Sequence, residues 1–324
     1  MRARPFVLLV CLLASLGLPP SFAHAASLAQ QRAMYDEAKR ALDKNDPGPY
    51  LRYRQALRDY PLEPHLAYDE LTLRLKSASN REIETFLAEH GDLPQIGWMK
   101  LRWLRWLAER GEWQTFIKHY SPALEFAELD CLMGEYLFRH GKAADGAIVA
   151  RRLWLVGKSQ PNTCDRLFDL WRAQGGLTEE LRWQRLKLAA QERNYGLAGH
   201  LQKTLGSLAA QGQLLIDVAQ KPELLAQRQR FAGNDRHTAD AVGLGLRRLA
   251  RQNPEQALAL LEDYSRQLPF SSEEKVAIAR EIGLTLARRF DSRALRVMSQ
   301  YDPELRDDTV SEWRARLLLR LGRW

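Results

Sequence analysis

Residues 98–107 read WMKLRWLRWL, and this short stretch carries the strongest indication of the fold. Coiled as an α-helix, it places apolar side chains on two separate faces: Trp98, Leu101 and Leu104 on one, and Trp103, Trp106 and Leu107 on the other. The basic side chains at positions 100, 102 and 105 occupy the little surface that remains. A helix that is apolar on two sides packs between two layers of other helices, which is typical of an α-solenoid.

The same helical character extends along the chain. β-Branched residues never occur more than two in a row, and strong helix formers such as Leu, Ala, Arg, Glu and Gln predominate. Apolar residues recur at intervals of three and four, as in three early stripes at positions 28, 34, 35 and 38, then 50, 53, 57 and 60, then 66, 71 and 75. The sequence therefore predicts an all-α protein.

Breaks between the helices follow from capping residues, prolines and glycines. Asp46–Pro49 closes the first helix, Tyr60–Pro61 ends the second, Asn80 caps a helix that starts at Arg81, Asn253–Gln256 and Ser271–Glu274 cap two more, and Asp302–Glu304 starts the last. Glycines at 91, 111, 141, 157, 175 and 176 mark further turns. Counting these breaks predicts on the order of 16 to 18 helices.

Helices this short must stack in pairs to bury their apolar faces. Residues 141–147 and 253–258 look locally like second helices of tetratricopeptide repeats, but the 34-residue period is not kept, so the repeats are irregular. The chain has 324 residues, 45% of them apolar and 27% charged, which fits a folded protein with a sizeable core. Length alone suggests about two domains. A helical array can absorb that length as one body, and we expect a single helical domain over residues 26–324.

The N-terminus has the pattern of a cleavable secretory signal. Arg2 and Arg4 precede an apolar run over residues 6–18, which is too short to span a bilayer, and small residues lead to a cleavage site between Ala25 and Ala26. An uncleaved N-terminal anchor is the alternative. No later stretch reaches 18 apolar residues, so the mature chain is expected to be exported and not to span a membrane.

Cleavage leaves two cysteines, Cys131 and Cys164. An even pair in an exported protein indicates a disulfide, and closing a loop of about 33 residues would stabilise the fold by roughly 3.7 kcal/mol. Two buried free thiols are the alternative. A metal site is disfavoured because no further ligand lies at zinc spacing near either cysteine.

The sequence offers no catalytic, metal or cofactor site. Ser272–Lys275 matches the S-x-x-K pattern of penicillin-binding enzymes without its partner motifs, and it also reads as a helix cap. Gly243–Gly245 lacks the third glycine of a dinucleotide loop, and the seven histidines are scattered. Adjacent acids at 179–180, 262–263 and 307–308 point to different helix faces and are expected to supply helix-start charge and solvation.

The net charge and the aromatic content indicate which class of molecule the chain binds. The formal net charge is +8, which favours anionic partners. Export makes nucleic acid improbable and leaves acidic cell-wall polymer or membrane headgroups. Seven tryptophans cluster between positions 98 and 183, and their helical spacing favours core packing over a sugar-binding surface.

One segment is specific enough to suggest a family. Residues 153–173 read LWLVGKSQPNTCDRLFDLWRA and closely resemble the N-terminal superhelical region of the soluble lytic transglycosylases of Gram-negative bacteria. Residues 58–68, RDYPLEPHLAY, look like an early helix-pair turn of that family, and residues 129–131 match the place of its other cysteine. The resemblance runs from about residue 28 and thins after about residue 206.

This resemblance implies a U-shaped, right-handed α-superhelix of irregular helix pairs. In the family, a linker domain completes the ring and a lysozyme-like domain cleaves peptidoglycan. The cut between N-acetylmuramic acid and N-acetylglucosamine uses no water and leaves 1,6-anhydromuramic ends, with one glutamate as acid and then base. The implied partners are murein glycan strands and proteins that build or hydrolyse the wall.

The chain departs from the family in its catalytic motifs. Glu-Ser, Gly-Leu-Met-Gln and Ala-Tyr-Asn-Ala-Gly are all absent, so no catalytic residue is carried over. We therefore expect the superhelical part of such an enzyme, from a fragment or a truncated gene product, which positions substrate without cleaving it. An exported tetratricopeptide-like scaffold for protein partners is the alternative.

Overall fold

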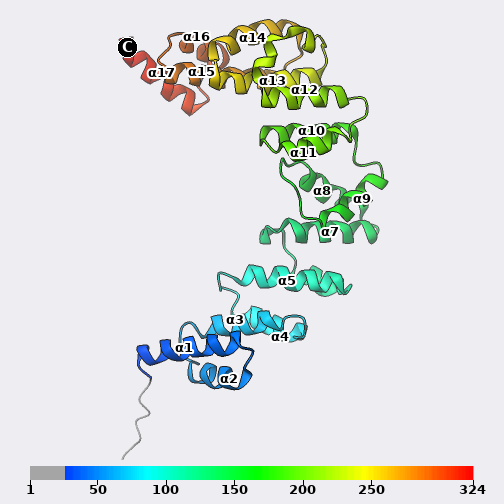
Figure 1. Cartoon of the computed structure of the whole chain (residues 1–324), viewed down its shortest axis with the longest axis vertical. Coiled ribbons are helices and arrows are strands. Elements are labelled where there is room, and N and C mark those ends of the chain that lie inside the picture. Colours follow the sequence, from blue (N-terminus) through cyan, green and yellow to red (C-terminus); the bar gives the residue numbers. More distant parts are fainter. Residues whose placement is uncertain (1–25, 324) are drawn as a thin grey trace, which may run out of the picture. The chain divides into compact units, whose positions relative to one another are not determined.

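The computed structural model describes residues 26–323, which form seventeen α-helices and three short 3-10 helices, with no strand in that range (Figure 1). The predicted all-α fold of successive short helices is confirmed, and the number of helices lies within the predicted range. The proposed signal sequence, with Ala25 at its cleavage site, lies outside the described residues; Ala26 is the first residue described.

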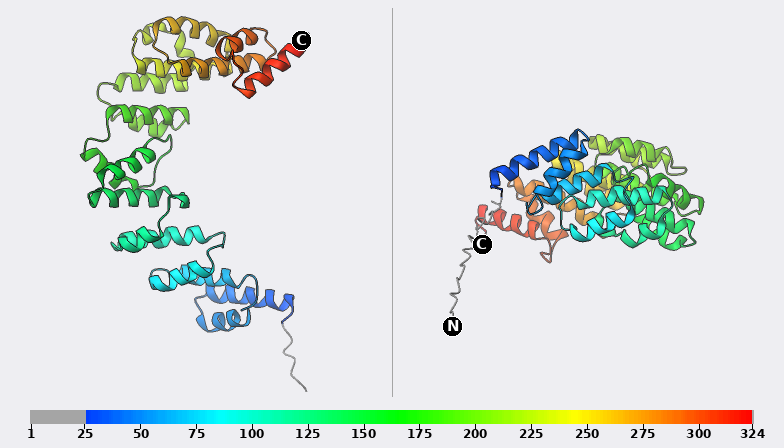
Figure 2. Two further views of the ribbon diagram at one scale, coloured as in Figure 1. Left: turned by 180° about the vertical axis from the view of Figure 1, so that it is seen from behind. Right: turned by 90° about the horizontal axis from the view of Figure 1, so that it is seen from below.

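The described chain divides into two compact units, with the boundary between Trp103 and Leu104. Figure 2 draws the helices from two further sides. The first unit contains α1 (Leu28–Asp43), α2 (Pro47–Ala56), α3 (Glu63–Leu73), α4 (Asn80–Glu89) and the start of α5 (Ile96–Glu109). The interpretation of residues 26–324 as one domain stays a prediction.

Tyrosines organise the core of the first unit. Tyr50 of α2 is buried together with Leu57, which follows the helix, and Tyr60. The Tyr50 hydroxyl donates a hydrogen bond of 3.1 Å to the carbonyl oxygen of Leu66 in α3. Burial raises the pKa of Tyr50 to about 12, so this hydroxyl stays protonated and keeps donating. The apolar stripe predicted for α1 is not buried at its first residue, because the Leu28 side chain is 55% exposed.

The cap of α4 lies one residue earlier than expected. The Ser79 hydroxyl accepts a hydrogen bond of 3.2 Å from the backbone N–H of Glu82, which makes Ser79 the N-cap. The predicted cap, Asn80, instead accepts a 3.1 Å hydrogen bond from the indole N–H of the fully buried Trp103. Trp98 is 58% exposed, so the prediction that this side chain packs into a helix layer was wrong.

The second unit holds the end of α5 and all later helices. They are α6 (Trp113–His119), η1 (Pro122–Leu124), α7 (Ala127–Arg139), α8 (Ala143–Trp154), α9 (Cys164–Ala173), α10 (Glu179–Gln191), α11 (Tyr195–Gln202), α12 (Ala209–Gln220), η2 (Pro222–Ala226), η3 (Arg228–Phe231), α13 (Arg236–Gln252), α14 (Pro254–Gln267), α15 (Ser272–Arg288), α16 (Arg293–Tyr301) and α17 (Asp308–Arg320).

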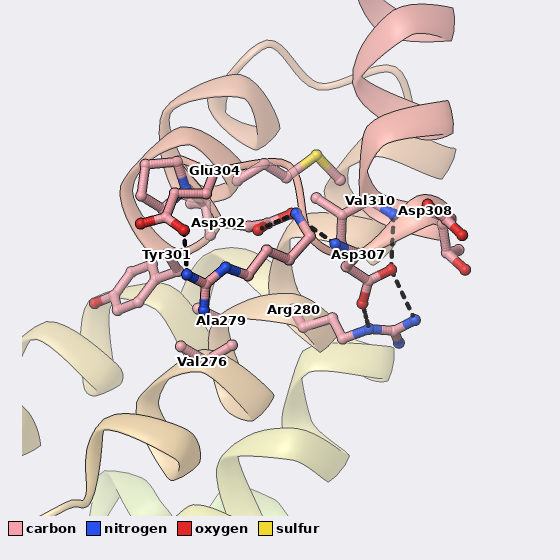
Figure 3. Close-up of a pocket in the computed structure, with 14 residues that line it drawn as sticks. Val276, Ala279, Arg280, Tyr301, Asp302, Glu304, Asp307, Asp308 and Val310 are labelled. Atoms are coloured by element: carbon pink, nitrogen blue, oxygen red, sulfur yellow. Dashed lines mark hydrogen bonds and ion pairs between the residues drawn. The ribbon is translucent and has the colours of Figure 1, made fainter.

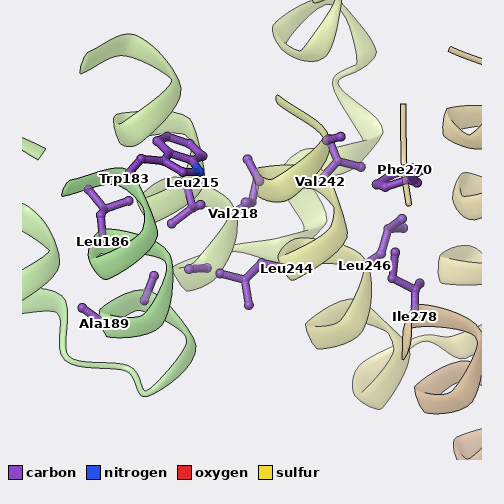
Figure 4. Close-up of a cluster of buried hydrophobic side chains, with 14 of the residues drawn as sticks. Trp183, Leu186, Ala189, Leu215, Val218, Val242, Leu244, Leu246, Phe270 and Ile278 are labelled. Atoms are coloured by element: carbon purple, nitrogen blue, oxygen red, sulfur yellow. The ribbon is translucent and has the colours of Figure 1, made fainter. Parts of the chain in front are cut away.

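Neighbours in sequence pack as pairs, with α7 against α8, α10 against α11 and α15 against α16. The core of this unit centres on α13, which contacts α12, α14 and α15 and is buried on several sides (Figure 4). Leu244 and Leu246 point from α13 toward different neighbours. Helix α13 is thus buried on several sides. In α5, Leu101 and Leu104 on one predicted apolar face and Trp103 and Leu107 on the other are also buried, as the pattern of residues 98–107 predicted.

Close helix approach explains one glycine of α13. A Cβ atom on Gly245 would lie 3.0 Å from Cδ1 of Leu225 and 3.2 Å from Cβ of Val218, so α13 could not pack as closely on η2 and α12 with a side chain there.

Two predicted caps are confirmed. The Asn253 side chain accepts from the backbone N–H of Gln256 at 3.0 Å, and Ser271 forms the expected capping box with Glu274 at 3.1 Å in both directions. Both caps start helices that pack on α13, so local sequence signals place these elements.

The start of the last helix was misplaced. Helix α17 begins at Asp308, and Asp307 is its N-cap, whereas residues 302–304 form a turn. The Asp302 carboxylate accepts hydrogen bonds from the backbone N–H groups of Arg306, at 2.9 Å, and Asp307, at 3.3 Å. An aspartate that closes a turn in this way competes with helix initiation at the same position.

The predicted disulfide between Cys131 of α7 and Cys164 of α9 is confirmed, with Cα atoms 4.9 Å apart and both residues fully buried. It joins two helices that also pack on each other. Across residues 26–323, none of the helices has both the length and the apolar character needed to cross a lipid bilayer.

Candidate functional site

A cavity of about 630 Å³ lies between α15, α16 and the start of α17 (Figure 3). Its apolar lining comes from Val276, Ala279, Val297, Met298 and Val310. Its polar lining comes from Arg280, Tyr301, Asp302, Glu304, Arg306, Asp307, Asp308 and Thr309. The volume falls within the range of small-molecule sites.

Three of the four acids that line this cavity are already engaged. Asp307 forms an ion pair with Arg280, and the hydrogen bond from Arg280 lowers the pKa of the Asp307 carboxyl. Glu304 pairs with Arg306, and Asp302 closes the turn before α17. An Asp307 carboxylate that Arg280 keeps ionised is a poor proton donor, so this residue is suited to binding and not to acid catalysis.

A second polar cluster is buried between α10, α13 and α15. Asp240 of α13 accepts hydrogen bonds from the indole N–H of Trp183, at 2.8 Å, and from the ammonium group of Lys187, at 2.7 Å. Glu274 of α15 lies within hydrogen-bonding reach of Asp240. With Arg247 and others, these groups line a cavity of about 140 Å³.

The two carboxyls of this cluster titrate in opposite directions. Burial works against ionisation of Asp240, but hydrogen bonds with Glu274, Lys187 and Trp183 outweigh it, so its pKa is lowered. Burial and the neighbouring Asp240 raise the pKa of Glu274. Glu274 therefore has a raised pKa, as a general acid does, but the cavity is too small to admit a disaccharide.

A third arrangement, around Trp154, accounts for the segment that suggested a family. The Trp154 indole N–H donates to the carbonyl oxygen of Leu181 at 2.9 Å, and its ring packs edge-on against Phe168 and Trp171. The buried guanidinium of Arg185 lies 4.3 Å from the centre of the Trp154 ring, and desolvation lowers the pKa of Arg185 to about 10. The segment is therefore a packing motif that fixes α8 and α9 on α10.

Four of the seven tryptophans between positions 98 and 183 pack in the interior, as the sequence favoured. Trp103, Trp154, Trp171 and Trp183 are buried, whereas Trp98 is exposed.

The structure assigns helix-terminal and pairing roles to most of the sequence motifs. Ser272 is the first residue of α15 and lies directly after its cap, so the S-x-x-K match is a helix start. Glu179, in the first turn of α10, accepts from the backbone N–H of Gly206 at 2.6 Å and of Leu208 at 3.1 Å. The helix-start role expected for residues 262–263 was wrong, because they lie in the second half of α14, where Asp263 pairs with arginines at 228 and 266.

Sequence reasoning missed Asp240, Glu274 and Arg185. The available signal was a charged residue within an otherwise apolar helix face, as at Asp240 between Ala239 and Ala241. Within residues 26–323, no group of three or more His, Cys, Asp or Glu side chains is placed to hold a metal ion.

Comparison with characterised proteins gives relatives of one kind. The soluble lytic murein transglycosylase of Escherichia coli K12 is 28% identical over 266 residues, which is 81% of this chain and 41% of that protein. The enzyme of the same name from Salmonella typhimurium is 28% identical over 286 residues, covering 86% of this chain and 43% of the relative. No protein-family model matches the chain.

Solved structures agree. An inactive glutamate-to-glutamine mutant of the lytic transglycosylase Slt from Pseudomonas aeruginosa is 66% identical, with a TM-score of 0.86, over 90% of this chain and 47% of that one. The 70-kDa soluble lytic transglycosylase in complex with bulgecin A is 23% identical, with a TM-score of 0.64 over 92% of this chain and 54% of that one, and shows that the fold is shared. The superhelical fold class expected from sequence is thereby confirmed, and the chain spans about half the length of the proteins it matches.

Proposed function

We propose that this chain, which is homologous to the soluble lytic murein transglycosylases over most of its length, is the α-superhelical part of a periplasmic peptidoglycan lytic transglycosylase. The observation that carries this proposal is the 66% identity to the Pseudomonas aeruginosa enzyme over 90% of the chain, with a TM-score of 0.86. The longer enzymes of this kind would cleave the bond between N-acetylmuramic acid and N-acetylglucosamine and leave 1,6-anhydromuramic ends.

The proposed role of this region is to guide glycan strands. Without Arg2 and Arg4 of the proposed signal sequence the formal charge of +8 becomes +6, which attracts anionic polymers, and peptidoglycan carries carboxylates on its peptide side chains. Attraction of this kind acts at long range at low ionic strength and weakens as salt screens it.

The proposal also holds that residues 26–323 carry no catalysis of their own. Lytic cleavage needs a carboxylic acid that can protonate the glycosidic oxygen in a groove that holds the sugar. Three of the four acids of the cavity beside α17, namely Asp302, Glu304 and Asp307, are bound to arginines or backbone N–H groups. Glu274, whose pKa is raised, lines a cavity of only about 140 Å³.

A periplasmic location is supported by two features. The first 25 residues have the composition of a secretory signal, and the disulfide between Cys131 and Cys164 suits an oxidising compartment.

Purified peptidoglycan sacculi test this function directly. We expect the chain to sediment with sacculi at an ionic strength of about 0.01 M and to be released at about 1 M, as the Debye length falls from about 30 Å to about 3 Å. We also expect no 1,6-anhydromuropeptides above a no-protein control. A failure to sediment at the lower ionic strength would refute the guiding role. Release of anhydromuropeptides that is lost on substituting one acid of this chain would refute the absence of catalysis.

A further inference from the structure

A cavity of about 380 Å³ at the C-terminal ends of α10, α12 and α13 is lined by cationic and neutral polar groups. Its lining residues are Arg193, Tyr195, Ala219, Gln220, Pro222, Arg248, Arg251 and Gln252. Three arginines and no acid line it, in contrast to the cavity beside α17, which has four acids. Three positive charges at one cavity favour an anionic ligand.

Arg248 forms the fixed wall of this cavity. Its terminal nitrogens donate to the carbonyl oxygens of Ala190 and Ala219, which end α10 and α12, and to the hydroxyl of Tyr195. The Tyr195 hydroxyl donates in turn to Ala219 at 2.9 Å. These bonds hold the guanidinium in place before any ligand arrives, so little conformational entropy is lost when one binds.

Arg251 adds donors at the rim. Its Nε–H donates to Glu281 at 2.9 Å, while its side chain is 59% exposed. Glu281 does not line the cavity. The ion pair therefore orients Arg251 and leaves its terminal N–H groups available to a ligand.

Arg193 supplies the third charge from an unusual backbone position. It follows α10 in the left-handed conformation, with φ of 62°, where glycine or asparagine is the common choice. Its side chain is exposed and has no hydrogen-bond or ion-pair partner within residues 26–323. Non-glycine residues occur in this conformation elsewhere in the described chain, for example Phe290 and Leu305, so what distinguishes Arg193 is its exposed charge at the cavity.

We propose that this cavity binds an oxyanion and, resting on the proposed function, that the oxyanion is a carboxylate on the peptide side chains of peptidoglycan. The planar guanidinium groups of Arg193 and Arg251 match a carboxylate or a phosphate through paired N–H donors. The cavity has the volume of a small-molecule site, so it admits the terminal residues of a peptide as well as the anionic group.

Calorimetric titration of the full chain tests this site. The ligands are a muramyl peptide with free carboxylates, the same compound with every carboxylate amidated, and inorganic phosphate. The variants are R193G, which should fold at least as stably as the original because glycine suits a left-handed turn, and R251Q. The control is R296Q, because Arg296 is 68% exposed, lies outside the cavity and is also one positive charge.

We expect the carboxylate form to bind and the amidated form not to bind. R193G and R251Q should each weaken binding about tenfold, as expected for one charge-assisted hydrogen bond, and R296Q should leave it unchanged. Equal weakening by R193G and R296Q would overturn the site, because it would reduce the effect to net charge. If inorganic phosphate binds and the muramyl peptide does not, the carboxylate assignment is overturned.

The two proposals fail separately. A chain that sediments with sacculi but does not bind the muramyl peptide refutes this site and leaves the guiding role standing. A chain that binds the peptide but not sacculi refutes the guiding role alone.

Discussion

Replacing Asp240 with asparagine should destabilise the second unit through a charge left without its partner. Asp240 is buried, and its carboxylate is the acceptor for both the Trp183 indole N–H and the Lys187 ammonium group. Asparagine has the same shape and can still accept from Trp183, so D240N isolates the loss of charge.

The size of the effect follows from the surroundings. Removing one partner of a buried ion pair costs about 3 to 5 kcal/mol. Two features reduce that cost here: the Lys187 side chain is 24% exposed, and Glu274 lies close enough to ionise in place of Asp240. We therefore expect D240N to lower the free energy of unfolding by about 2 kcal/mol.

Urea unfolding at neutral pH, followed by far-ultraviolet circular dichroism, measures this free energy. Hydrogen exchange of peptides from α10 and α13 should locate the loss in the helices that the cluster joins. The surface variant D169N is the control, since the Asp169 side chain is 63% exposed and its loss should change stability by less than about 0.5 kcal/mol.

A double variant sharpens the test. Lys187→Met removes the charge that D240N leaves unpaired, so D240N with K187M should cost less than the two single variants added together, by about 1 to 2 kcal/mol. Additive effects, or a D240N protein as stable as the D169N control, would refute the reasoning that the ion pair holds α10 to α13.

Three further outcomes are expected. Replacing Cys131 and Cys164 with alanine should lower the free energy of unfolding by about 3.7 kcal/mol, since 33 positions separate them. Urea unfolding with and without reductant measures this difference, and a clearly smaller difference would contradict the expectation. Gly176→Ala should cost about 2 kcal/mol, because the new Cβ would lie 2.1 Å from Nε1 of the buried Trp171; an unchanged melting temperature and near-ultraviolet spectrum would contradict this. The pKa of Glu274 is raised, so its contribution to stability is full below its ordinary pKa of 4.5 and is lost as pH rises through the higher folded-state pKa. Glu274→Gln should therefore stabilise the protein at pH 7. It should also make the free energy of unfolding less dependent on pH above 4.5. Parallel pH profiles for the variant and the original would count against that assignment.

Local signals predicted the helices well because they act over a few residues. Asn253 and Ser271 cap the helices that follow them, because each side chain bonds a backbone N–H only three residues away. The errors arose where a local signal had a competitor. Asn80 is engaged by Trp103, which lies 23 positions away, and Asp302 closes a turn before it can start a helix.

The candidate sites escaped sequence reasoning because they join distant positions. Asp240 meets Trp183 and Lys187 across 57 and 53 positions, and Arg248 reaches Ala190 across 58. No periodicity links such residues, since only the packing of α10 on its neighbours brings them together. The disulfide was predictable despite its 33-residue separation because two cysteines leave one pairing.

The segment that suggested a family and the cavity proposed to bind an anion differ in what constrains them. Trp154 and Arg185 are buried against each other, so most substitutions there would disturb packing, and resemblance in this segment reports architecture. Arg193 and Arg251 are exposed at helix ends, where a change of side chain costs the fold little. A protein can therefore keep this helical array and lose the anion site. The residue that best separates the two is Arg193, because its exposed side chain lines the cavity while glycine would suit its left-handed backbone.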